Sequence, residues 1–281
     1  MAEESKEKKE QSKNSTFELL SWAQQGQEVT VRDDQYEFLQ LLDGIQLCRQ
    51  KGGRFRLIDS GNLDSFSLEW LGKVGADVYT SSSARKNLQE LTFINKGCQK
   101  GKALLGFFHQ LEGKEEPKEE GWSWADLMNL GGEGVYIYLV SGKEESDFSS
   151  IISLAGECQR GGSWLVYYHH GSVDSQLVNL AENGAWIHVS DQIIQEDNDY
   201  RVLLDTVKSA QSAGAGVVFH MEKGLEFSKL LDLSKAGASI MLKPSLMDLR
   251  YPFEKIADKA RKKKLDYRAY YLYSHFFPGV F

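Results

Sequence analysis

Gly161-Gly162-Ser163-Trp164-Leu165-Val166-Tyr167-Tyr168-His169-His170 joins a glycine turn to a short apolar run that ends in two histidines. A helix-forming segment follows over residues 173–182, and the turn Asn183-Gly184-Ala185 then leads into a second apolar run at residues 186–190. Short runs rich in aromatic and β-branched residues that alternate with helical segments are typical of βαβ units. The stretch therefore predicts parallel strands connected by helices.

The same alternation continues on both sides of this stretch. Strands are predicted over residues 54–59, 76–81, 103–109, 135–140, 164–170, 186–190, 216–220 and 239–243, each followed by a helical segment. Turns such as Gly75-Ala76 and Gly237-Ala238 precede several strands, because glycine past the end of a helix readily adopts the left-handed conformation. Eight strand–helix units are the number found in a closed (β/α)8 barrel of the TIM type.

An open, doubly wound sheet is the alternative architecture, since hydrophobic periodicity alone does not separate it from a barrel. The number of units and the lack of a dinucleotide-binding glycine motif favour the barrel. We therefore predict an α/β fold with a single (β/α)8 TIM-type barrel over about residues 54–264, in a domain that extends to residue 281. Residues 1–14 are predicted to be a disordered charged tail, and residues 15–53 to be extra N-terminal helices packed on the barrel.

The composition is that of a globular protein and argues against several classes of partner. Hydrophobic residues make up 41% of the 281 residues and charged residues 26%, with a net charge of −7. This acidic balance gives no electrostatic footprint for nucleic acid or an anionic membrane, and no apolar run approaches the ~20 residues of a membrane helix. The three scattered cysteines, Cys48, Cys98 and Cys158, fit a reducing compartment. We expect a cytoplasmic protein without nucleic-acid or membrane partners.

Histidines gather at the predicted carboxyl ends of the strands. All strands of a barrel run parallel, so these ends share one rim, where barrel active sites lie. Imidazole titrates near neutral pH and binds divalent metals, so it can act as a general base or as a metal ligand. The predicted catalytic residues are Asp59, His109, His169, His188, His220 and Lys243, and the four histidines are the predicted ligands of a divalent metal such as Zn or Mn. The alternative is that these histidines cap strands and bond to loops.

Further side chains are candidates for substrate binding. Arg85 follows the serines 81–83, so a guanidinium, the hydroxyl of Ser82 and backbone amides meet at a helix start that could hold an anion. Glu222 follows the seventh predicted strand, and Lys243, at the end of the eighth, could hold a substrate anion or form a Schiff base. A helix cap at residues 81–83 and a salt bridge of Lys243 at the rim are the structural alternatives.

These candidate residues support two functions of different class. The first is a hydrolase or lyase that acts on a small polar or anionic substrate in a histidine-rich barrel mouth, assisted by a metal. The second is a non-catalytic barrel that serves as a binding or assembly module. The clustered histidines support the enzyme. The first predicted strand and the turn after it read Leu57-Ile58-Asp59-Ser60-Gly61 and carry no histidine pair, which supports the binding module.

The end of the chain is rich in aromatic residues. They are Tyr267, Tyr270, Tyr271, Tyr273, Phe276, Phe277 and Phe281. Aromatic side chains at this density must be covered in a folded protein. We expect them to pack against the barrel and the N-terminal helices, and the alternative is an interface between copies in a homo-oligomer.

Overall fold

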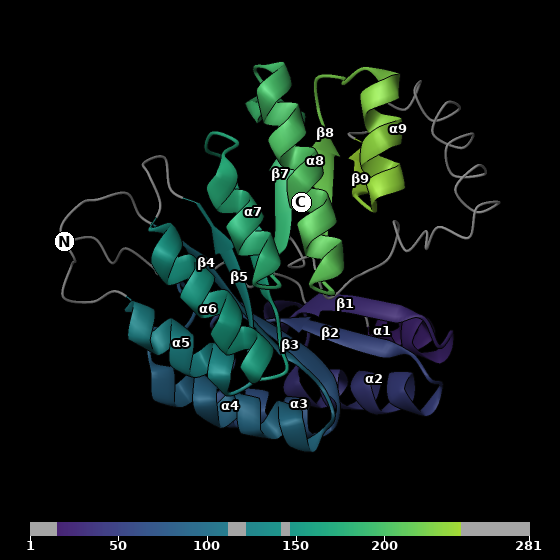
Figure 1. Cartoon of the computed structure of the whole chain (residues 1–281). Helices are drawn as coiled ribbons and strands as arrows, with labels where there is room; N and C mark the ends of the chain where they lie inside the picture. The colour runs from purple at the N-terminus through teal and green to yellow at the C-terminus, as the bar shows by residue number, and fades with distance from the viewer. Residues whose placement is uncertain (1–15, 112–121, 142–146, 243–281) are drawn as a thin grey trace, which may run out of the picture.

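The structure is a computed structural model that describes residues 16–111, 122–141 and 147–242. Within these residues, nine parallel strands form one sheet in which the spatial order of the strands equals their order in the chain (Figure 1). The strands are β1 (Glu28–Arg32), β2 (Arg54–Ile58), β3 (Ala76–Ser81), β4 (Leu105–Gln110), β5 (Tyr136–Val140), β6 (Leu165–Tyr168), β7 (Trp186–Ser190), β8 (Val217–Met221) and β9 (Ser239–Leu242).

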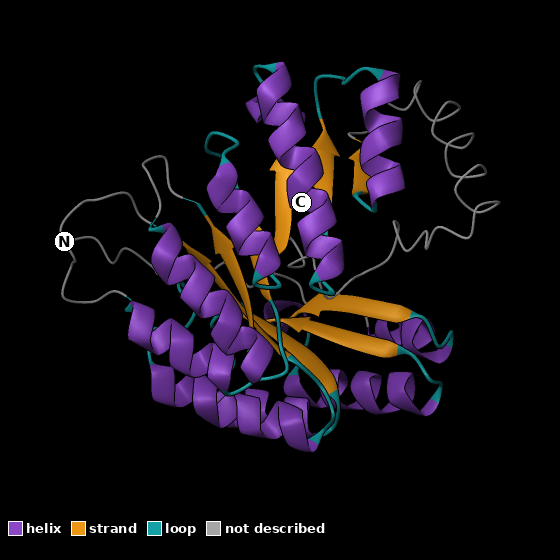
Figure 2. Ribbon diagram, in the orientation of Figure 1, coloured by secondary structure: helices purple, strands orange, loops and turns teal. Residues whose placement is uncertain are grey.

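Helices alternate with the strands throughout the described residues (Figure 2). They are α1 (Thr16–Gln24), α2 (Phe38–Gln50), α3 (Ser65–Lys73), α4 (Leu88–Lys100), α5 (Trp124–Gly132), α6 (Phe148–Arg160), α7 (Ser175–Glu182), α8 (Asp197–Ser212) and α9 (Phe227–Ala236), with the short 3-10 turns η1 (Asp33–Gln35) and η2 (Asp191–Ile193). No helix among them is both long and apolar enough to cross a membrane.

The sequential strand order confirms the α/β fold of the TIM type. A doubly wound sheet reverses its strand order at a switch point, and this sheet does not reverse. The eight predicted strands correspond to β2–β9. Within the described residues, β1 pairs only with β2 and β9 pairs only with β8.

Strand β1 corrects the prediction that residues 15–53 contain only helices. It lies between α1 and α2 and pairs in parallel with β2 over its whole length. Only Val29 and Val31 are buried in it, because charged or polar residues occupy the other positions. Two apolar residues are too few to produce a strand signal, so the partner strand supplies the information that the local sequence lacks.

Helix boundaries follow from local capping. The Asp64 side chain accepts a hydrogen bond from Ser67 N at the start of α3, and Asn87 does the same for Gln89 N at the start of α4. Each helix then buries a single stripe of apolar residues, such as Leu68 and Leu71 in α3. Local sequence therefore explains where the helices begin and which side of each faces the sheet.

The sheet has two faces with different surroundings. Crossovers between neighbouring parallel strands are right-handed, so the helices all lie on one side of the sheet, here called the outer side. Side chains such as Leu57, Phe107 and Ile187 fill the large core on that side. Alternate positions point to the other, inner side, where Tyr79, Tyr138, Tyr168 and Trp186 are among the members of a second buried cluster.

Glycines allow two pairs of neighbouring helices to pack closely. Gly161, at the end of α6, lies so near Gly131 of α5 that a Cβ atom would overlap the Gly131 carbonyl oxygen. Gly101, at the end of α4, has the same relation to Gly72 of α3. The φ of Gly161 is −73°, which any residue adopts, so the close approach alone requires glycine there.

We predict that Gly161→Ala lowers the free energy of unfolding by about 2 kcal/mol or more, because the added methyl group forces α5 and α6 apart. Gly156→Ala in the same helix is the matched control, since a Cβ at Gly156 meets no atom within 4 Å. That control should stabilise the protein by roughly 0.5–1 kcal/mol through helix propensity. Urea unfolding of both variants measures the difference, and equal stability of Gly161→Ala and the unmodified protein would contradict the packing described.

Candidate functional site

Two histidines meet on the inner side of the sheet at the carboxyl ends of β7 and β8. Their ring atoms His188 Nδ1 and His220 Nε2 are 3.0 Å apart, which is hydrogen-bond distance. The aromatic ring of Tyr168, from β6, lies 4.3 Å from the His188 ring, centroid to centroid. His188 is only 2% exposed, so the pair is held in a largely dehydrated environment.

A carboxylate lies next to this histidine pair. Glu222, just past β8, accepts hydrogen bonds from the Ser190 hydroxyl at 3.2 Å and from the Gln192 side-chain amide. Ser190 ends β7 and pairs with His220 in the register of the two strands. We call the set His188, Ser190, His220 and Glu222 the histidine-pair site.

The loop that carries Glu222 is fixed by a buried aspartate. Asp191, 6% exposed and the first residue of η2, accepts hydrogen bonds from the backbone N–H groups of Glu222, Lys223 and Gly224. Three donors satisfy the carboxylate and hold the end of β8 against the end of β7. The position of Glu222 is therefore set by the backbone.

Burial sets the charge state of the histidine-pair site. It lowers the pKa of His220 from its ordinary value of 6.5 to about 4, the nearby Glu222 carboxylate opposes this shift, and His170 adds to it. Desolvation dominates because the imidazolium loses more hydration than a single partly exposed carboxylate returns. His220 is thus neutral at pH 7, where one of its ring nitrogens is a donor and the other is an acceptor.

His109 and His169 lie away from this pair, which corrects the expectation of a four-histidine ring. The His109 ring stacks on Phe107, at 6.4 Å between centroids. The His169 ring packs against Phe148 at 6.0 Å, and its Nε2 is 2.9 Å from the Ser172 carbonyl oxygen. Each of these histidines comes directly after a residue whose side chain points to the inner side. Because successive side chains alternate, both histidine side chains point to the outer side, where the helices lie.

His170, rather than His169, is the β6 histidine that is electrostatically coupled to the site. It contributes to the lowered pKa of His220, and its backbone N–H donates to the Ser141 hydroxyl at 2.9 Å. The signal for this choice was present in the alternation of the strand, because Tyr168 and His170 are separated by two positions. The sequence does not say which of the two faces of the strand points inward. The burial of Tyr168 in the inner-side cluster shows that the face shared by Tyr168 and His170 does so.

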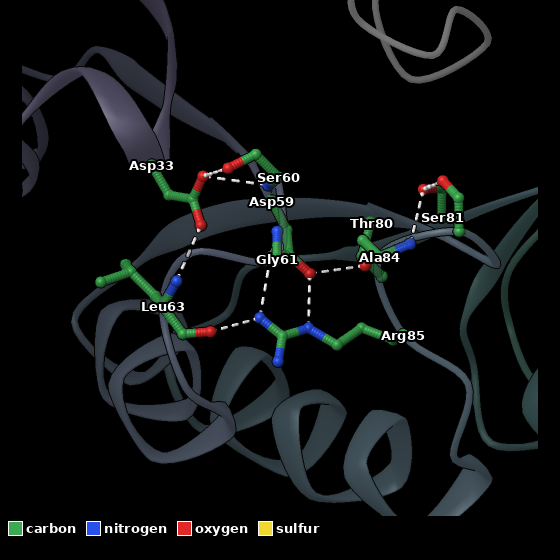
Figure 3. Close-up of polar contacts among 10 residues, drawn as sticks. Asp33, Asp59, Ser60, Gly61, Leu63, Thr80, Ser81, Ala84 and Arg85 are labelled. Atoms are coloured by element: carbon green, nitrogen blue, oxygen red, sulfur yellow. Dashed lines mark hydrogen bonds and ion pairs between the residues drawn. The ribbon is translucent and has the colours of Figure 1, made fainter. Parts of the chain in front are cut away.

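Asp59 and Arg85 form a buried ion pair on the outer side (Figure 3). The guanidinium donates from Nε and Nη2 to the two carboxylate oxygens, each at 2.8 Å, and Nη2 also donates to the Leu63 carbonyl. The Thr80 hydroxyl donates to the same carboxylate at 2.6 Å. Asp59 is 5% and Arg85 7% exposed, so their hydrogen bonds join the loops after β2 and β3.

Two other predicted binding residues have different positions. Ser82 lies in the loop after β3, where its backbone N–H donates to the Phe108 carbonyl at 2.9 Å. The hydroxyls of its neighbours Ser81 and Ser83 are hydrogen-bonded to each other. The serine hydroxyls and the Arg85 guanidinium are therefore used in contacts within the loops (Ser81 and Arg85 are labelled in Figure 3). Lys243 lies outside the described residues.

The donor set does not fit the metal site expected from the four histidines. Within residues 16–111, 122–141 and 147–242, no group of three or more His, Cys, Asp or Glu side chains is arranged to hold a metal ion. The ring nitrogens that face each other in the pair, His188 Nδ1 and His220 Nε2, are hydrogen-bonded together. What the site offers chemically is a proton donor and a proton acceptor in contact, beside a carboxylate.

Comparisons with known proteins add no family. No protein-family model matches the chain, and no curated protein matches it in sequence. The chain is similar in structure to a mandelate racemase/muconate lactonizing protein from Herpetosiphon aurantiacus (8% identity, TM-score 0.34, 78% of this chain and 54% of that one). It is also similar to 3-dehydroquinate dehydratase from Enterococcus faecalis (14%, 0.36, 82% and 92%). A third similar structure is the YdjI aldolase from Escherichia coli K12 (11%, 0.32, 95% and 98%). The chain spans about half the length of the first of these, and scores this low carry no argument about function.

We predict that Asp59→Asn lowers the free energy of unfolding by about 3 kcal/mol, because it leaves the buried Arg85 charge without its counter-ion. The exposed pair of Asp205 and Lys208 supplies the control, and Asp205→Asn should cost less than ~1 kcal/mol. Urea unfolding at neutral pH measures both changes. An Asp59→Asn variant as stable as the Asp205→Asn control would show that the buried pair does not hold these loops.

We predict that His220 makes the protein less stable as the pH falls from about 6.5 to 4. The folded state holds the pKa of His220 near 4, whereas the unfolded state has the ordinary 6.5, so the unfolded state binds more protons in this window. The loss contributed by this residue should reach up to about 3 kcal/mol at the acid end.

Replacement of His220 by glutamine should flatten the pH dependence of unfolding between pH 6.5 and 4. His170→Gln is the control, because His170 is exposed and is the smallest of the three influences on the His220 pKa. Unfolding free energies of the three proteins across this range test the point, as does a His220 NMR titration. A titration midpoint near 6.5 in the folded protein would refute the burial argument.

Proposed function

We propose that the chain is an enzyme of the hydrolase or lyase class that uses the histidine pair for general acid–base catalysis on a small polar substrate. The observation that carries this proposal is the 3.0 Å contact between His188 Nδ1 and His220 Nε2 at the carboxyl ends of adjacent strands. In folds of the TIM type this end of the strands holds the active site.

The pair supports proton transfer because each ring constrains the other. A hydrogen bond between two imidazole nitrogens needs one protonated and one unprotonated atom, so the two tautomers are coupled. A proton taken up at one ring can pass through the hydrogen bond and leave from the other. Hydrolysis and elimination both require this combination, a base for water or a C–H group and an acid for the leaving group.

Burial keeps the His220 ring neutral at pH 7 but weakens it as a base, so catalysis needs a group that stabilises its protonated form. A histidine that is neutral at pH 7 can accept a proton, and the Glu222 carboxylate nearby would stabilise the imidazolium that forms. The Ser190 hydroxyl and the Gln192 side-chain amide donate to Glu222 and thereby orient its carboxylate. No step of this mechanism uses a metal.

The second candidate function is a non-catalytic barrel that binds a ligand or a partner. The observation that favours it is the use of Asp59, Arg85, His109 and His169 in ion-pair and packing contacts on the outer side of the sheet. Under this proposal the histidine-pair site binds a small polar molecule without converting it. Turnover by the unmodified protein, or ligand binding without turnover, separates the two candidates.

We predict that His188→Gln and His220→Gln, which keep a polar side chain of similar size at each largely buried position, each lower the rate of the reaction by at least ~100-fold while the melting temperature changes little. A screen of esters, phosphoesters, amides and β-hydroxy acids finds the reaction, and the protein is purified without chelator so that its metal content is measured in parallel. His109→Gln is the control that should keep full activity, since His109 lies on the outer side.

The results distinguish three cases. Loss of activity in both pair variants, with full activity in the control, supports the enzyme. Ligand binding without turnover in the unmodified protein supports the binding barrel. A large drop in melting temperature in both pair variants, with unchanged binding or turnover, would show that the pair is structural and would overturn the proposal.

A further inference from the structure

The His188 ring is the part of the histidine pair whose orientation its own side chain does not fix. The torsion that turns a histidine ring about its Cβ–Cγ bond is broad and roughly two-fold, so an unconfined ring adopts both orientations. In the observed orientation His188 Nδ1 faces His220 Nε2 at 3.0 Å. Half a turn would put the ring carbon Cδ2 in place of Nδ1, so the hydrogen bond depends on a neighbour that selects one orientation.

Side chains of the two neighbouring strands flank this ring on the inner side of the sheet. In the register of the parallel strands, Tyr168 of β6 lies directly opposite His188, and Val218 of β8 lies opposite it on the other flank. The pairing of β6 with β7 continues past Tyr168, because His169 N donates to the His188 carbonyl oxygen at 2.9 Å. Neighbouring strands are about 4.8 Å apart, so the side chains of Tyr168 and His188 leave the backbone next to each other.

The rings of Tyr168 and His188 are in direct contact. Their centroids are 4.3 Å apart and their planes are tilted by 49°. Tyr168 is 1% and His188 2% exposed, so bulk water does not fill the space around the two rings. A phenol ring at this distance occupies the volume through which the imidazole would pass if it turned over.

Tyr168 can act as a fixed wall because it belongs to a packed cluster. Tyr138, Trp186 and Val218 are other members of this buried cluster on the inner side of the sheet. Protein interiors are packed as densely as organic crystals, so the Tyr168 ring cannot move aside without displacing its neighbours. The confinement of His188 is therefore a property of the folded core.

We propose that Tyr168 is a positioning residue that holds the His188 ring with Nδ1 toward His220. Catalytic pairs commonly have a third group that orients one partner, and a misplacement of about 1 Å can cost ~100-fold in rate. Here the third group is an aromatic ring that acts by contact. The consequence for catalysis rests on the proposed function, whereas the orientation of the ring is measured without a substrate.

Nitrogen NMR of the isotope-labelled full chain at pH 7 measures this orientation. A hydrogen bond between two ring nitrogens gives a slowly exchanging N–H proton and a scalar coupling between His188 Nδ1 and His220 Nε2. The unmodified protein should show both signals, and Tyr168→Phe, which keeps the aromatic ring, should retain them. Tyr168→Leu should lose the coupling, because the His188 ring is then free to turn.

Tyr138→Leu is the matched control. Tyr138 is buried in the same cluster, but it lies opposite Phe108 and Val166 in the register and therefore two strands away from His188. Both leucine variants should lower the melting temperature by similar amounts, while only Tyr168→Leu loses the coupling. In a reaction found by the substrate screen, Tyr168→Leu should lower kcat to at least ~10-fold below that of Tyr138→Leu.

The coupling decides the proposal. Its retention in Tyr168→Leu, its equal loss in Tyr138→Leu or its absence from the unmodified protein would each overturn the positioning role. If Tyr168→Leu does not fold, Tyr168→Met replaces it under the same criteria, since a flexible methionine fills irregular gaps in a core. Loss of the coupling in the Tyr168 variant alone, in a protein that turns over no substrate, would support the positioning role and contradict the proposed enzyme.

Discussion

Alternation of side chains along parallel strands is the constraint on which this structure depends. Each strand offers one set of positions to the helices and the other set to the inner side, and a shift of one residue exchanges the two sets. The register between β7 and β8 places Ser190 opposite His220, and His188, two residues before Ser190, points to the same side of the sheet. The histidine pair exists because both strands keep this register to their carboxyl ends.

Buried carboxylates hold the loops at the carboxyl ends of the strands in place. Asp33 follows β1 and accepts hydrogen bonds from the backbone of Ser60 and Leu63 in the loop after β2. Asp191 follows β7 and binds the loop after β8 in the same way. In each case, backbone N–H groups of the loop after the neighbouring strand donate the hydrogen bonds that the buried carboxylate accepts. These bonds to the backbone hold the loops that carry the functional groups.

The predicted and observed sites differ for reasons that lie in these contacts. Strand ends were predicted correctly for His188 and His220, since both follow short apolar runs after a glycine turn. The residue types at His109, His169 and Asp59 suggested the same chemistry. Their positions along the strands, however, point these side chains to the outer side of the sheet, whereas His188 and His220 point to the inner side. The three outer-side residues therefore pack among the helices or pair with Arg85. Desolvation of His220, which keeps it neutral, depends on its burial in the folded protein, and no local sequence pattern reports it.

The amino-acid sequence by itself determined the alternation of helices and strands, the positions of β2–β9 and their parallel direction. These properties follow from local signals, namely apolar runs, caps and glycine turns, which act within a few residues. The tertiary structure alone decided that Glu28–Arg32 is a strand, which histidines face each other and which carboxylates are consumed in ion pairs. Those outcomes depend on register and on which face the helices cover, and both are set by contacts between segments far apart in the chain.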